Sequence, residues 1–97
     1  MTIAFATTDE EIQDCYVVMS ELRPHIAAEE FLPRVRQQME SSGYRVAYLK
    51  DGEVKAVAGI RISDWLHGGK YLEIDDLISK SGERSKGYGG ELFDWIV

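Results

Sequence analysis

The sequence has one cysteine, two histidines and no long apolar run, and each of these shortages excludes a class of protein. A lone cysteine, Cys15, cannot form an internal disulfide, and two distant histidines provide no metal-ligand cluster. No apolar stretch approaches the ~18 residues that a membrane-spanning helix requires, and the N-terminus lacks the layout of a signal peptide. The sequence therefore predicts a cytoplasmic protein without a disulfide or zinc scaffold.

Positive charge is also scarce, since 11 Lys and Arg face 17 Asp and Glu and the formal net charge is -6. Such a field repels phosphate polymers and anionic lipid, so we expect neither nucleic acid nor a membrane as a partner. A length of 97 residues with 44% hydrophobic content suits one small domain. We therefore expect residues 1–97 to form a single domain.

The first half of the chain predicts a strand and two helices. Residues 2–7 alternate as a short strand, and the pairing of Thr8 with Glu11 predicts a capping box that begins a helix. A second helical pattern ends at Gly43, a typical C-terminal cap. It contains Pro33, so we expect this helix either to start late or to kink there.

Three strands and a last helix follow. Residues 44–50 and 54–66 alternate as strands around the hairpin signal at 51–52, and residues 71–78 complete an antiparallel meander. Gly59 lies within the second of these strands and predicts a bulge or the close approach of another backbone. The order strand, two helices, three strands and helix indicates an α+β fold, in which helices cover a mostly antiparallel sheet.

The most informative stretch is the loop at residues 83–92, which leaves the last strand and enters the last helix between closely spaced glycines. Glycines let backbone amides approach a ligand, and a helix N-terminus adds N–H donors suited to phosphate. The stretch matches neither a Walker A loop nor a dinucleotide-binding fingerprint. By itself it leaves two interpretations open, a phosphate cradle and a plain tight turn.

Arg84, Gly87 and Gly89 have the spacing Arg-x-x-Gly-x-Gly, which resembles the Arg/Gln-x-x-Gly-x-Gly/Ala signature of the GNAT N-acetyltransferase superfamily. The signature follows a strand, as it does in that family, and the upstream elements resemble the N-terminal half of the family fold. The resemblance covers nearly the whole chain. It implies a mixed, mostly antiparallel sheet flanked by helices and truncated after the helix that follows the phosphate-binding loop.

The same resemblance implies acetyl-CoA as the cosubstrate and transfer of its acetyl group to a primary amine. Loop amides would hold the pyrophosphate, and the strand backbone would hold the pantetheine arm and the thioester carbonyl. The implied cofactor-binding residues are Leu77, Ile78 and Ser79 on the strand and Arg84, Ser85, Lys86, Gly87, Tyr88, Gly89 and Gly90 in the loop.

Acyl transfer to an amine requires a group that deprotonates the amine. Glu73 and Asp75 alternate onto the same strand face as Leu77, where two carboxylates can raise each other's pKa. The spacing from Glu73 to the glycine loop resembles that of the histone-acetyltransferase branch, which implies that Glu73 is the base, with Asp75 next in line. The alternative is an exposed acidic edge that discourages aggregation. We expect Asp76 to point the other way, in a structural role.

The family fold continues beyond the equivalent of Val97 with another strand, another helix and a hairpin, and its usual general acid lies there. The resemblance therefore implies an N-acetyltransferase whose 97-residue chain is inactive alone. The alternative is a non-catalytic module that binds CoA or another protein. Because the net charge steers cations, we expect the acceptor to be a small-molecule amine or a lysine-bearing protein.

The last segment is strongly apolar, with five large apolar residues in six positions: Leu92, Phe93, Trp95, Ile96 and Val97. One helical face cannot bury all of them against a three-stranded meander. The outer edge of the strand at 71–78 also leaves unpaired amides and carbonyls. We therefore expect a homodimer formed through this helix or this strand edge.

Overall fold

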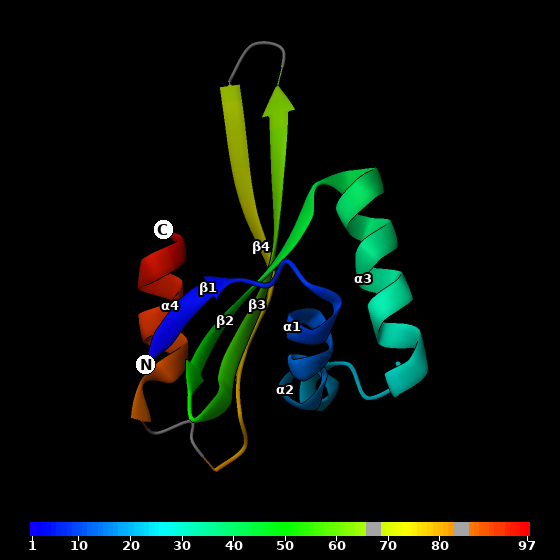
Figure 1. Cartoon of the computed structure of the whole chain (residues 1–97). Helices are drawn as coiled ribbons and strands as arrows, with labels where there is room; N and C mark the ends of the chain where they lie inside the picture. Colours follow the sequence, from blue (N-terminus) through cyan, green and yellow to red (C-terminus); the bar gives the residue numbers. More distant parts are fainter. Residues whose placement is uncertain (66–68, 83–85) are drawn as a thin grey trace.

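A computed structural model of the chain describes residues 1–65, 69–82 and 86–97. Its sheet has the order β1-β2-β3-β4, and every neighbouring pair is antiparallel (Figure 1). The strands are β1 (Thr2–Phe5), β2 (Tyr44–Asp51), β3 (Glu53–Trp65) and β4 (Gly69–Ser79). The helices are α1 (Asp9–Asp14), α2 (Tyr16–Leu22), α3 (Ala28–Ser42) and α4 (Tyr88–Ile96). The predicted α+β architecture is confirmed.

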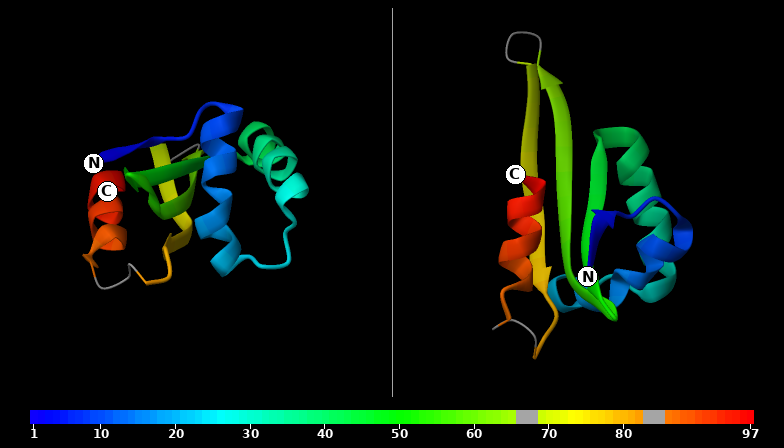
Figure 2. Two further views of the ribbon diagram at one scale, coloured as in Figure 1. Left: turned by 60° about the horizontal axis from the view of Figure 1, so that its bottom comes forward. Right: turned by 60° about the vertical axis from the view of Figure 1, so that its left-hand side comes forward.

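Helices cover both faces of the sheet and enclose a separate hydrophobic core on each. The helices α1, α2 and α3 lie on one face, and α4 lies on the other (Figure 2). Because side chains alternate along a strand, Val46 packs in the first core and Ala47 in the second. Within the ranges given above, no helix is long and apolar enough to cross a membrane.

The capping box at the start of α1 is confirmed. The Glu11 amide donates to the Thr8 hydroxyl at 3.1 Å, while Glu11 Oε1 accepts from the amides of Thr8 at 3.0 Å and Thr7 at 2.9 Å. The predicted helix is divided, because α1 ends at Asp14 and α2 begins at Tyr16. The apolar residues that the sequence analysis assigned to one helix are therefore divided between two short helices, with Ile12 buried on α1 and Met19 buried on α2.

The helix α3 begins at Ala28 and encloses Pro33, so the predicted late start is wrong. The amides of Glu30 and Phe31 both donate to the Ala27 carbonyl and form the first turn before the proline is reached. A proline at this point removes one amide from the ladder without preventing that turn. The helix ends at Gly43, as predicted, where φ is +68°.

A bulge in β4 changes which of its side chains face which core. Gly59 pairs with Asp76 and Ile60 with Ile74, so Asp75 has no partner on β3. As a result Ile74 packs in the α4 core, whereas Ile78 packs in the core under the other helices. The bulge predicted at Gly59 is confirmed, but the group that approaches closely is a side chain: a Cβ at this position would lie 2.0 Å from Tyr44 Oη.

The apolar residues of α4 are only partly covered. Leu92 is fully buried, and the Trp95 ring lies 5.1 Å from the Phe5 ring, but Phe93 and Trp95 remain 42% and 43% exposed. In the part of the chain that the structure describes, β4 pairs with β3 alone and forms one edge of the sheet. The homodimer stays a prediction.

We predict that Glu11 makes the stability of the fold depend on pH. Hydrogen bonds, first of all from the Thr8 amide, lower the pKa of Glu11 from 4.5 to about 2. Because the pKa is lower in the folded chain than in the unfolded chain, ionised Glu11 stabilises the fold. This stabilisation is complete above pH 4.5 and is lost as the pH falls through about 2. Glu11→Gln should therefore lower Tm at neutral pH, and the difference from wild type should shrink on acidification.

Thermal unfolding followed by circular dichroism at several pH values measures this difference. Glu10→Gln is the control, because this exposed residue lies in the same helical turn and makes no capping contact. A loss of Tm in Glu11→Gln that stays constant from neutral to acidic pH would contradict the prediction.

Candidate functional site

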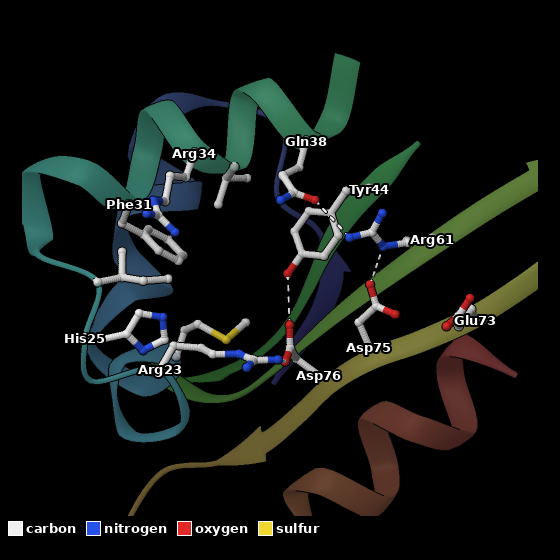
Figure 3. Close-up of a pocket in the computed structure, with 13 residues that line it drawn as sticks. Arg23, His25, Phe31, Arg34, Gln38, Tyr44, Arg61, Glu73, Asp75 and Asp76 are labelled. Carbon is white, nitrogen blue, oxygen red and sulfur yellow. Dashed lines mark hydrogen bonds and ion pairs between the residues drawn. The ribbon is translucent and has the colours of Figure 1, made fainter. Parts of the chain in front are cut away.

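A pocket of about 640 Å³ lies on the sheet face that α1, α2 and α3 cover. Helix α3 forms one wall, β4 forms the opposite wall, and the end of α2 with the turn after it closes a third side (Figure 3). The polar side chains that line it are Arg23, His25, Arg34, Gln38, Tyr44, Arg61, Glu73, Asp75 and Asp76. The pocket is therefore rich in groups that can bind charge.

Three carboxylates of β4, those of Glu73, Asp75 and Asp76, line the same pocket. The prediction that Asp76 points away from Glu73 is wrong, and so is the placement of Leu77 on the face of Glu73 and Asp75. The bulge at Asp75 is the cause, because one extra residue reverses the alternation that follows it. Beyond the bulge Asp76 faces the pocket, and Leu77, 39% exposed, faces away from it.

Two of these carboxylates are held by arginines. Arg23 Nη2 lies 2.5 Å from Asp76 Oδ1, and the Tyr44 hydroxyl donates to Asp76 Oδ2 at 3.4 Å. Asp75 forms an ion pair with Arg61. Burial, followed by the charge of Asp76, raises the pKa of Tyr44, which keeps its hydroxyl protonated as a donor. Asp76 is only 9% exposed, and these partners offset the loss of its hydration.

Glu73 differs from its two neighbours. Its side chain is exposed at the pocket, and within the described residues no hydrogen bond or ion pair holds its carboxylate. Glu73 and Asp75 do share a face, as the alternation predicts. Of the three carboxylates, Glu73 is thus the one whose oxygens are open to a ligand. Its role as a base stays a prediction.

The glycine loop leads into the N-terminus of α4. Gly87 has φ +79° and caps the helix, and amides in the first turn, such as those of Gly89 and Gly90, have no preceding carbonyl in the helix to accept them. A Cβ at Gly89 would lie 2.7 Å from Ser79 Oγ, so this glycine lets the start of α4 pack against the end of β4. Arg84 and Ser85, two of the predicted cofactor-binding residues, lie outside the described residues.

The remaining predicted cofactor-binding residues lie on two adjacent elements. Ile78 is buried, Ser79 is half-buried, and Lys86 is exposed just before the helix. The Tyr88 hydroxyl donates to Asp51 Oδ2 at 2.9 Å and so ties the start of α4 to the β2–β3 hairpin. The structure therefore brings the end of β4 and the start of α4 together, and the role of these residues in binding a cofactor stays a prediction.

The sequence analysis missed the arginines of the pocket and Gln38. Arg34 and Gln38 stand one turn apart on α3, beside the buried positions Phe31 and Val35, which is the signal that could have placed them on the inner side. Arg23 and Arg61 have no comparable local signal. They reach the carboxylates only through tertiary contacts.

We predict that the Arg23–Asp76 pair stabilises the fold more than the Arg36–Asp9 pair does. The two pairs have similar lengths, 2.5 and 2.6 Å, but Asp76 is 9% exposed and Asp9 is 69% exposed. Arg23→Gln should lower the free energy of unfolding by about 1–2 kcal/mol, since Arg23 itself is half exposed, and Arg36→Gln by less than about 1 kcal/mol. Urea unfolding of both variants measures the two losses, and equal losses would contradict the prediction.

Comparison with known proteins bears on what this site does. Residues 6–97 match the Acetyltransferase (GNAT) family. An uncharacterized N-acetyltransferase, YhdJ of Bacillus subtilis (strain 168), is 33% identical over 90 residues, which make up 92% of this chain and 63% of that protein. This chain thus spans less than two thirds of the length of that curated relative.

Solved structures share the fold. A GNAT family acetyltransferase of Staphylococcus aureus subsp. aureus USA300_TCH1516 superposes with a TM-score of 0.80 at 15% identity, over 98% of this chain and 73% of that one. For glucosamine-6-phosphate N-acetyltransferase of Arabidopsis thaliana the TM-score is 0.72 at 15% identity, over 99% and 72%. Together with the family match along nearly the whole sequence, these findings show that the chain belongs to the GNAT acetyltransferase family.

Proposed function

We propose that this chain forms part of an N-acetyltransferase that transfers the acetyl group of acetyl-CoA to a primary amine. The observation that carries the proposal is the position of Glu73. Its uncommitted carboxylate lines a pocket on β4, the same strand whose far end packs against the glycine loop. A proton acceptor and a phosphate-binding segment thus belong to one continuous strand and its loop.

The residues fit acetyl-CoA, an extended ligand that carries phosphates at one end and a thioester at the other. Alternate residues of an antiparallel strand direct their backbone groups to the same edge. Because the Lys80 amide donates to the Lys55 carbonyl on β3, Leu77 and Ser79, rather than Ile78 between them, direct backbone groups to the outer edge of β4, where the pantetheine arm would lie. The amides at the start of α4 would hold the pyrophosphate, together with the positive end of the helix dipole. A Cβ at Gly87 or Gly90 would meet nothing within 4 Å, so their backbone is accessible to a ligand.

The residues of this chain then have separate tasks. Acetyl-CoA, when bound, would supply the acetyl group: its thioester C–S bond breaks as the amide C–N bond forms, and CoA leaves as a thiolate that takes up one proton to become the thiol. Glu73 accepts the proton that the amine gives up, directly or through water. Asp75 and Asp76 are each paired with an arginine instead. These pairs also hold the bulge beside Glu73.

We extend the proposal to the partners of the protein. A net charge of -6 favours an amine acceptor over nucleic acid or anionic lipid. The exposed rings of Phe93 and Trp95 on α4 support a homodimer formed through this helix.

We predict that Gly89→Val weakens the binding of acetyl-CoA by more than about tenfold. The added side chain would meet Ser79 Oγ and push the start of α4 away from β4, which separates the two sets of backbone donors. Isothermal titration calorimetry measures the affinity. Asp94→Val, which places the same side chain at an exposed position of α4, is the control and should bind normally.

The wild-type chain provides the outcome that would overturn the proposal. With millimolar acetyl-CoA it should release or absorb heat and shift the amide NMR signals of residues 87–90. No heat and no shift would refute acetyl-CoA binding by this chain. Binding without turnover would instead favour a non-catalytic module.

We predict that Glu73→Gln lowers kcat by roughly 10²-fold or more at neutral pH in an active form of the protein. The loss should diminish at high pH, where the amine is already neutral and needs no base. Initial rates across a pH series measure this, with Glu40→Gln on the exposed surface of α3 as the control. A pH–rate profile that Glu73→Gln leaves unchanged would assign the role to another group, with Asp75 the next to test.

A further inference from the structure

The side chain of Tyr44 passes over Gly59 on β3 and reaches β4. A Cβ at Gly59 would lie 2.7 Å from Tyr44 Cζ and closer still to the hydroxyl, so only glycine lets the ring lie there. The hydroxyl donates to Asp76 Oδ2 at 3.4 Å, as the dashed line in Figure 3 shows. Asp76 is the ladder partner of Gly59 and directly follows the bulged residue. Tyr44 thus contacts β4 at the point where the alternation of its side chains reverses.

This reversal determines which groups at the end of β4 are presented to a ligand. Beyond the bulge Leu77 and Ser79 direct their backbone groups to the outer edge, and Ser79 Oγ lies close to Gly89 at the start of α4. In a β4 without the extra residue, Ile78 would direct its backbone groups outward instead, and the Ser79 side chain would face the opposite side of the sheet. The bulge therefore affects both surfaces to which the proposed function assigns acetyl-CoA.

Tyr44 and Arg23 together hold Asp76 on the pocket side of the sheet. Arg23 Nη2 lies 2.5 Å from Asp76 Oδ1, and the Tyr44 hydroxyl contacts the second carboxylate oxygen. Because Asp76 is buried, loss of a partner would be unfavourable there and would favour a strand in which this side chain turns away. Arg23 is half exposed, whereas Tyr44 is buried in the core. The Tyr44 hydroxyl is therefore the partner that is fixed from within the fold.

We propose that Tyr44 is a positioning residue for the cofactor. Its hydroxyl keeps Asp76 on the pocket side and so preserves the bulge, which selects Leu77 and Ser79 as the residues whose backbone faces acetyl-CoA. Tyr44 acts on the cofactor through β4 and not by contact. This inference rests on the proposed function, and it adds a residue of β2 to the strand edge and glycine loop considered so far.

Tyr44→Phe tests this role, because it keeps the ring over Gly59 and removes only the hydroxyl. A fraction of the molecules should then adopt a β4 without the bulge, and the measured affinity for acetyl-CoA should fall in proportion to the fraction that retains it. Since hydrogen bonds to charged groups are among the stronger ones, we expect acetyl-CoA to bind about threefold more weakly, or weaker still. Isothermal titration calorimetry measures the change.

Tyr48→Phe is the matched control. Tyr48 is also buried on β2, and its hydroxyl donates to a carboxylate oxygen, Glu11 Oε2, at 3.3 Å. That carboxylate belongs to α1 and not to β4. Tm measurements show how much stability each variant loses, and only Tyr44→Phe should weaken the binding of acetyl-CoA.

The register of β4 provides a second readout, which a general loss of stability would not change. In the wild-type chain, NOE cross-peaks should connect Gly59 with Asp76. In Tyr44→Phe a second set should connect Gly59 with Asp75, because a strand without the extra residue has this pairing. Tyr48→Phe should show the wild-type set alone.

Three results would overturn the inference: an unchanged affinity in Tyr44→Phe, a loss of affinity that Tyr48→Phe shares in full, or a loss of affinity with the β4 register unchanged. Failure of the proposed function is distinguishable from these. A wild-type chain that does not bind acetyl-CoA would refute the proposed function and this role with it. A wild-type chain that binds acetyl-CoA, with a Tyr44→Phe variant that binds equally well, would refute this role alone.

Discussion

The bulge in β4, where Asp75 has no partner on β3 in the β ladder, is the feature on which the rest of the site depends. Side chains alternate along a strand, so one extra residue moves everything after it to the other face. Ile74 therefore packs under α4, while Ile78 packs under the opposite helices. Gly59, on the strand opposite, has no side chain and leaves space for Tyr44, whose hydroxyl reaches Asp76. A regular strand would place Asp76 on the α4 face.

The three carboxylates around this bulge differ in burial and in their partners, and this difference determines which of them can contact a ligand. Asp76 is buried and needs both Arg23 and Tyr44, because an unpaired carboxylate in that position would be strongly unfavourable. Asp75 is paired with Arg61, which is itself held by Gln38. In the part of the chain that the structure describes, Glu73 is the one carboxylate of the pocket without a hydrogen bond or ion pair. One strand thus supplies two structural ion pairs and one open carboxylate within four residues.

Local signals in the sequence were sufficient for most elements and for the family. Thr8 with Glu11, Gly43 and the hairpin at 51–52 each depend on a few neighbouring residues, and all three lie where predicted. The direction of Asp76 could not be predicted in the same way. Gly59 indicated a bulge, but which strand carries the extra residue depends on the register between β3 and β4. The pocket arginines act across the tertiary structure, which residue spacing does not reveal.

A crystal structure of the chain with bound CoA would test the account most directly. We expect Asp75 to lack a ladder partner on β3, with Gly59 still opposite Asp76 and Ile60 still opposite Ile74. Density for the ligand should follow the outer edge of β4, with its pyrophosphate at the start of α4 and its sulfur end beside the pocket that Glu73 lines. A β4 without the bulge, or a ligand bound away from both β4 and α4, would contradict the account.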